Sequence, residues 1–144
     1  WQDLSSDWFI GFSTRVTGLT PNTKYYFKVK SLNGSGEQET EYSLSANTYT
    51  IAQLPVALSF FNIKTETIDT QWSGENNPKY TEYLVENVIS GTNSGWITDT
   101  VWISTGLLPN SAYYFRVKAR NKSLIETSSI GKVLIFWPSL RTVT

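Results

Sequence analysis

Two glutamates, Glu82 and Glu86, are the first candidates for chemistry in this chain, because they lie in one alternating polar and apolar segment. On a strand, residues separated by an even number of positions point to the same face. Paired carboxylates on one face can cleave a glycosidic bond when a cleft encloses the sugar between them. Nothing in the segment predicts such a cleft. We therefore interpret both side chains as part of a solvated strand face.

The other residue types that enzymes and metal sites use are absent or isolated. The 144 residues include no His and no Cys, which removes the commonest general base, the thiolate nucleophile and the usual zinc ligands. Asp3 and Asp7 supply carboxylates without the remaining oxygen ligands of a calcium site. No glycine-rich phosphate-binding pattern is present. We expect no catalysis, no cofactor and no bound metal.

Charge and hydropathy narrow the classes of partner. Twelve basic residues balance twelve acidic ones, so the chain has no general attraction for nucleic acid or for an anionic membrane. No apolar run approaches the roughly 20 residues of a membrane-spanning helix, and no signal-peptide pattern opens the sequence. The chain contains no Met, so we expect it to be processed or excised from a longer polypeptide.

An internal repeat is the strongest pattern in the sequence. Its offset is 106 − 18 = 88 residues, and Trp8 and Trp96 share that offset. A period of this length corresponds to a small domain rather than to a solenoid turn. The repeated residues are Gly18, Leu19, Pro21, Asn22, Tyr25, Tyr26, Phe27, Val29, Lys30 and Asn33, which reappear as Gly106, Leu107, Pro109, Asn110, Tyr113, Tyr114, Phe115, Val117, Lys118 and Asn121.

Apolar residues recur with a period of two, which predicts strands that are buried on one face. Turn-forming pairs such as Asn33-Gly34 and Ser94-Gly95 separate these segments, and no segment has a sustained helical period. The pattern predicts an all-β antiparallel sandwich. The expected strands are residues 25–30, 67–72, 81–88, 96–104 and 113–120.

The repeated segment resembles the corner between the E and F strands of a fibronectin type III module, with similarity to bacterial members. The matching residues are Leu107, Pro109, Ser111, Tyr113, Phe115, Val117 and Ala119, and in the earlier copy Leu19, Pro21, Thr23, Tyr25, Phe27 and Val29.

The resemblance implies an immunoglobulin-like β-sandwich in tandem arrangement. It implies that Tyr25 and Tyr113 are tyrosine corners, in which the hydroxyl forms a hydrogen bond with upstream backbone. It also implies core positions for Trp72, Tyr83, Phe115 and Val117.

The repeat predicts one complete module and the latter part of another. We assign residues 1–50 to the C-terminal part of a first module, 51–55 to a linker, 56–137 to a complete module, and 138–144 to a tail or the next linker. Half a sandwich would expose Tyr25, Phe27 and Val29, each worth roughly 1.5–3 kcal/mol when buried. Either upstream sequence of the same polypeptide completes the first module, or another chain does.

Three surface features have both a functional and a plain structural interpretation. The apolar run Val133, Leu134, Ile135, Phe136 and Trp137 is either an assembly interface or a buried strand that enters a hinge. Tyr114, Arg116 and Lys118 form either a ligand face for an acidic glycan or protein loop, or a solvated strand face. Asn33 and Asn121 begin N-glycosylation acceptor patterns, or are turn formers that match the pattern by chance.

These features favour a non-catalytic extracellular structural, spacer or adhesion module within a larger secreted or cell-surface protein. One alternative is a self-assembling filament or surface-layer subunit, joined end to end through the incomplete first module and the apolar last strand. A second alternative is a carbohydrate- or protein-binding module. The expected partners are neighbouring modules, identical chains, or a protein or glycan ligand.

Overall fold

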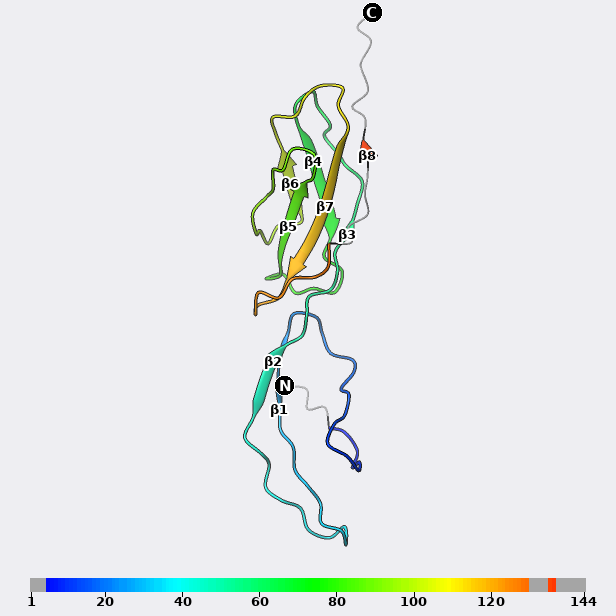
Figure 1. Ribbon diagram of the computed structural model, residues 1–144, viewed down its shortest axis with the longest axis vertical. Helices are drawn as coiled ribbons and strands as arrows, with labels where there is room; N and C mark the ends of the chain where they lie inside the picture. The colour runs from blue at the N-terminus through cyan, green and yellow to red at the C-terminus, as the bar shows by residue number, and fades with distance from the viewer. Residues whose placement is uncertain (1–4, 130–134, 137–144) are drawn as a thin grey trace, which may run out of the picture.

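The structure is a computed structural model and describes residues 5–129 and 135–136. These residues form strands, turns and bends, and none of them lies in a helix, so this part of the chain offers no helix that could cross a membrane. The fold is elongated, with a short ribbon at one end and a larger group of strands beyond it (Figure 1). The strands are β1 (Lys24–Phe27), β2 (Ala46–Tyr49), β3 (Val56–Ala57), β4 (Ile68–Ser73), β5 (Glu82–Asn87), β6 (Val101–Ser104), β7 (Tyr113–Arg120) and β8 (Ile135–Phe136).

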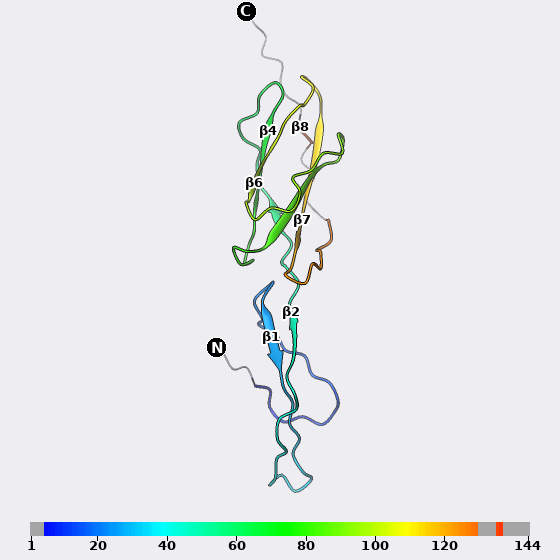
Figure 2. The ribbon, with the colours of Figure 1, turned by 90° about the vertical axis from the view of Figure 1, so that its left-hand side faces the viewer.

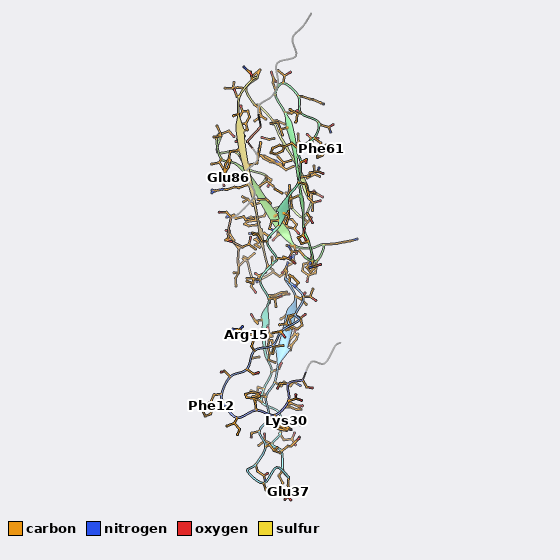
Figure 3. The ribbon with its side chains drawn as sticks, turned by 90° about the vertical axis from the view of Figure 1, so that its right-hand side faces the viewer. Phe12, Arg15, Lys30, Glu37, Phe61 and Glu86 are labelled. Atoms are coloured by element: carbon orange, nitrogen blue, oxygen red, sulfur yellow. The ribbon has the colours of Figure 1, made fainter. Side chains whose placement is uncertain are left out.

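The first repeat is a two-stranded antiparallel ribbon of β1 and β2, in which Tyr25 pairs with Thr48. The ladder continues beyond the strands toward the tip of the hairpin, where Glu37 lies (Figure 3). Because one ribbon cannot bury both of its faces, its apolar side chains stay in contact with solvent. Phe27 and Val29 are exposed, as are Trp8, Phe9 and Phe12 on the preceding loop.

The second repeat is a sandwich of two antiparallel sheets, β3-β4-β6 and β5-β7-β8. Figure 2 shows β4 and β6 in one layer and β7 in the other. Along β7, residues alternate between buried and half-buried, which confirms the period-two interpretation of this segment. The described core consists of Ala52, Ile68, Trp72, Tyr83, Val85, Leu107, Tyr113, Phe115, Val117 and Ala119.

Aromatic contacts join the two layers of the sandwich. The Trp72 and Tyr83 rings meet edge to face with centroids 5.8 Å apart, and Trp102 lies 6.2 Å from Phe115 in a similar arrangement. Such geometries are favourable because the edge of one ring is electropositive and the face of the other is electronegative.

The expectation of a single strand over residues 96–104 is wrong. Ile97 forms an isolated bridge with Tyr83 of β5, whereas Val101 pairs with Gln71 of β4 in the opposite sheet. The chain therefore crosses from one layer to the other between these positions. Alternation persists on both sides of the crossing, so the apolar pattern does not reveal it. Gly95, with a φ of 64°, precedes the crossing.

The pairing of the last described strand repeats that of the first ribbon. Tyr113 pairs with Phe136 and Tyr25 pairs with Thr48, and both members shift by the repeat length, since 113 − 25 = 88 and 136 − 48 = 88. Val133, Leu134 and Trp137 of the proposed assembly interface lie outside the described residues. Ile135 and Phe136 form the short strand β8, whose backbone pairs with β7.

Candidate functional site: the junction between the repeats

The two candidate carboxylates are held in ion pairs on the outside of the β5-β7-β8 sheet. The Arg120 Nε–H donates to Glu82 Oε2 over 2.8 Å, and the Arg116 Nε–H donates to Glu86 Oε2 over 2.7 Å. The hydrogen bond from Arg120 lowers the pKa of Glu82 below its ordinary value. Glu86 points away from the sandwich (Figure 3). Both carboxylates are therefore held by arginine partners, which suits a strand face better than acid–base work.

Metal-binding geometry is also missing from the part of the chain that the structure describes. Within residues 5–129 and 135–136, no three His, Cys, Asp or Glu side chains gather closely enough to hold an ion. Asp7 is exposed on the loop before β1, and Asp3 falls outside the described range.

Each repeat contains a tyrosine hydroxyl bonded to upstream backbone. The Leu108 N–H donates to the Tyr113 hydroxyl over 2.6 Å, and the Thr20 N–H donates to the Tyr25 hydroxyl over 2.8 Å. This is the geometry of a tyrosine corner, and in the second repeat it fixes the turn that leads from β6 in one sheet to β7 in the other. The turn ends in a Pro-Asn pair in both copies.

Asn22, at the end of the first of these turns, is almost completely buried, with 1 % of its surface exposed. Its φ of 46° lies in the left-handed region, which Asn tolerates better than most residues. Its backbone N–H donates to the carbonyl oxygen of Ile51 over 3.1 Å, so the turn is attached to the segment that leaves β2.

The polar groups of Asn22 connect the first repeat to the second. Its Nδ2 donates to Thr81 Oγ1 over 2.9 Å, and its Oδ1 accepts from the Lys122 N–H over 2.8 Å. Its backbone carbonyl accepts from the Tyr80 hydroxyl over 2.7 Å. A buried polar network in which every member has a partner rigidifies the contact that it forms. In Figure 1 this contact lies where the ribbon meets the near end of the sandwich.

Asn121 strengthens the same junction from the other side. It is 1 % exposed, and its Nδ2 donates to the carbonyl oxygen of Thr50 over 3.1 Å. Its Oδ1 accepts from the N–H groups of Ser123 and Ile125, which shapes the turn after β7. The nitrogen that a glycan would occupy is therefore buried and bonded in the folded chain. Asn33, the equivalent residue in the first repeat, is exposed.

A third amide fixes the connecting segment itself. The Gln53 N–H donates to Asn77 Oδ1 over 2.7 Å, and Asn77 Nδ2 donates back to the Gln53 carbonyl oxygen over 2.8 Å. Ala52 belongs to the core of the second repeat, and Pro55 is buried. The segment between the repeats is thus packed and hydrogen-bonded along its length.

The outward face of β7 combines cations with an aromatic ring. The Arg120 guanidinium lies 4.3 Å and the Lys118 ammonium 5.5 Å from the centre of the Trp96 ring. Lys118 also pairs with Glu126 over 2.5 Å. The first repeat has the same arrangement, with Lys30 over Trp8 and paired with Glu39, and the hydrogen bond to Glu39 raises the pKa of Lys30.

The proposed ligand face is therefore largely paired within the chain. Tyr114 is half-buried, and Arg116 and Lys118 each contact a carboxylate. An acidic ligand would have to replace these intramolecular partners or add to them.

Asn22 and Asn121 both belong to the repeated set of residues, but nothing in the sequence indicates that both lie at the junction. Their partners lie far away in sequence, as with Asn22 and Lys122. The sequence does show that an Asn recurs after the proline of the repeated turn, as Asn22 and Asn110. Gly adopts a positive φ at lower steric cost than Asn, so an Asn that recurs in such a turn indicates a role for its side-chain amide.

No known protein family model matches the chain. Its structure is similar to a two-domain fibronectin type III segment from chicken tenascin, with a TM-score of 0.54, 13 % identity, and coverage of 79 % of this chain and 64 % of that one. It is also similar to the FN1–FN3 domains of chicken CNTN1, with a TM-score of 0.47, 20 % identity, and coverage of 83 % and 42 %. The chain thus spans less than two thirds of either structure. Paired antiparallel sheets, the two tyrosine corners and the likeness to tenascin together establish that this chain has the fibronectin type III fold.

Proposed function

We propose that this chain is a non-catalytic structural or adhesion module of a larger extracellular or cell-surface protein, in which it sets the spacing and direction of neighbouring modules. The observation that carries the proposal is the Asn22 junction, in which a buried amide, bonded through both its nitrogen and its oxygen, joins the two repeats. The described residues offer paired carboxylates rather than an acid–base site, which agrees with a mechanical role.

The mechanism is the suppression of bending between modules. A flexible linker would leave adjacent modules free to reorient, which is the default expectation for small interfaces. Here Asn22, Asn77 and Asn121 bond the turn, the linker and the exit of β2 to the sandwich. Bending at this point would break several buried or partly buried hydrogen bonds at once, at a cost of about 1 kcal/mol for each.

Small-angle X-ray scattering of the full chain tests this proposal. Asn22→Gly keeps a residue that accepts positive φ and removes the bonded side chain, so we expect a broader distribution of interatomic distances. Asn110→Gly is the matched control, because Asn110 has a φ of 53° but an exposed side chain. Identical scattering from both variants and the unaltered chain would overturn the proposal.

A filament or surface-layer subunit is the second candidate, favoured by the exposed apolar face of the first repeat. Val29 and Leu44 stay open to solvent although their repeat is built on sandwich architecture. Completion of that sheet by a second chain would bury them. Sedimentation velocity at increasing concentration distinguishes the two functions. Growing species would favour assembly, and a constant monomer would exclude assembly through this face.

A carbohydrate- or protein-binding role at the β7 face is the third candidate, supported by the aromatic and basic side chains beside Trp96. Replacement of Tyr114 and Arg116 by Ala should weaken binding on a glycan array and leave the unfolding midpoint within a few degrees. Unchanged binding would exclude this face.

A further inference from the structure

The Pro-Asn turn of the first repeat occurs again at the far end of the second repeat with the same local structure. Asn22 and Asn110 have φ angles of 46° and 53°, and the preceding Gly18 and Gly106 have 74° and 69°. A hydroxyl two residues after the proline donates to the proline carbonyl in both turns, over 2.9 Å from Thr23 and 3.2 Å from Ser111.

The strand pairing beside the two turns is also the same. β2 pairs with β1 beside the first turn, and β8 pairs with β7 beside the second in the same register, since Tyr25↔Thr48 and Tyr113↔Phe136 differ by the repeat length. The two ends are therefore two copies of one surface. We call them the Asn22 end and the Asn110 end, each consisting of its Pro-Asn turn and the first residues of the strand that follows.

The environments of the two ends differ. The Asn22 end is covered by the second repeat, and Asn22 is 1 % exposed. The Asn110 end is exposed: Leu108 has 69 % of its surface accessible to solvent, and Pro109 and Asn110 are exposed as well. The two turns have similar φ angles and the same hydrogen bond from a hydroxyl to the proline carbonyl, but only the Asn22 turn is covered by a neighbouring repeat.

The covered Asn22 end shows which groups a partner must supply. The partner must offer a tyrosine hydroxyl that donates to the backbone carbonyl of the asparagine, as Tyr80 does, and a threonine hydroxyl that accepts from the asparagine Nδ2, as Thr81 does. It also needs a backbone N–H directed at Oδ1, as in Lys122. These groups belong to the near end of a module of this same repeat.

We propose that the Asn110 end is a docking surface for the near end of a further module of this repeat, joined in tandem behind β8. Continuity with the existing junction favours this occupant over any other protein, since the same turn already binds that surface once. The residue equivalent to the buried Ala52 is 52 + 88 = 140, a leucine, which keeps an apolar side chain at that position. The inference rests on the proposed function, because it requires that the Asn22 contact hold the two repeats together in solution.

The test uses the full chain extended by one module. Residues 1–139 are followed directly by a second copy of residues 52–144, because Ser139 is the equivalent of Ile51. Amide hydrogen exchange is then measured by NMR at Lys122 in both copies, since this N–H is bonded to an asparagine side chain at the junction. We expect the appended Lys122 amide to exchange about tenfold more slowly than an open amide, as the loss of one hydrogen bond implies.

Two substitutions assign that protection to the proposed contact. Asn110→Gly should abolish protection of the appended Lys122 and leave the first one unchanged, and Asn22→Gly should do the reverse. Tyr80→Phe in the appended copy removes the hydroxyl that would donate to Asn110 and keeps the ring, so it should weaken the same protection without affecting core amides.

The outcomes separate this inference from the function on which it rests. Rapid exchange at the appended Lys122, with slow exchange at the first Lys122 and in both cores, would overturn the docking surface and leave the junction intact. Protection of the appended amide that survives Asn110→Gly would also overturn it. Rapid exchange at both Lys122 amides would overturn the proposed function together with the inference.

Discussion

At the scale of single residues, buried asparagines have a role that simple turn chemistry does not require. Asn22 and Asn110 satisfy the same backbone demand, but only Asn22 also bonds a neighbouring repeat. The side chain of Asn121 likewise bonds both its own turn and the exit of β2. The junction is therefore built from amides, which donate and accept at the same time.

Replacement of Asn22 measures the strength of this contact. Asn22→Gly leaves Thr81 and the Lys122 N–H without their partner, so we expect the free energy of unfolding to fall by about 1–3 kcal/mol. Asn110→Gly at the exposed equivalent should change it by less than about 0.5 kcal/mol. Urea denaturation followed by tryptophan fluorescence compares the two, and equal effects would contradict the role assigned to Asn22.

The tyrosine corners allow a second paired substitution. Tyr113→Phe removes the hydroxyl that accepts from the Leu108 N–H in the buried corner, and should cost about 1–3 kcal/mol. Tyr25→Phe removes the equivalent bond at an exposed position, where water can replace it, and should cost less. Thermal unfolding of both variants provides the measurement, and a larger effect at Tyr25 would contradict this account.

At the scale of elements, the sequence predicts strand positions correctly where one face of the strand is buried. The prediction fails where the chain changes from one sheet to the other. The alternation in β7 and in β5 corresponds to real burial, so these strands were predictable within a residue or two. The crossing after Ile97 was not predictable, because the alternation of apolar residues continues through it and only the partner strand changes. The junction was not predictable either, since its bonds join residues as distant as Asn22 and Lys122.

The β5–β7 pairing predicts an acid-sensitive contribution to stability. Arg120 holds the pKa of Glu82 below its ordinary value of 4.5, so the folded state binds this proton less tightly than the unfolded state. The stabilisation is then fully present above that ordinary value and is lost as the pH falls through the folded pKa. For a partly exposed pair we expect about 0.5 kcal/mol at neutral pH.

Glu82→Gln should therefore lower stability at pH 7 and flatten the acidic limb of the stability curve. Glu66→Gln, at an exposed glutamate, is the control. Chemical denaturation between pH 2 and 7 provides the measurement, and an acidic limb that keeps its slope in Glu82→Gln would contradict the assignment.

Close packing between β4 and β5 makes a further prediction. A Cβ at Gly74 would overlap the hydroxyl oxygen of Tyr83, so Gly74→Ala should destabilise the sandwich by about 1–3 kcal/mol. Gly34→Ala meets open space at an ordinary φ and is the matched control. Adding Tyr83→Phe to Gly74→Ala should recover part of the loss in a double-mutant cycle, and a purely additive result would exclude the steric explanation.

At the scale of the whole molecule, one β-sandwich and one two-stranded ribbon are joined into an elongated body (Figure 1). The fold class was predictable because a long repeat, two Pro-Asn turns and alternating aromatics agree with one another. The exposure of the apolar side chains in the ribbon was also expected, because the sequence predicts only part of a module over residues 1–50. The hydrogen-bonded packing of the connection was not predictable, because a short apolar linker is compatible with either a hinge or a packed junction.

The central claim is that the junction fixes the direction of one repeat relative to the other. Residual dipolar couplings, measured on the full chain in a weakly aligning medium, test this most directly. We predict that the amide couplings of β1 and β2 fit the same alignment tensor as those of β4, β5 and β7. Two different tensors, each fitting its own repeat, would mean that the repeats reorient freely and would contradict the claim.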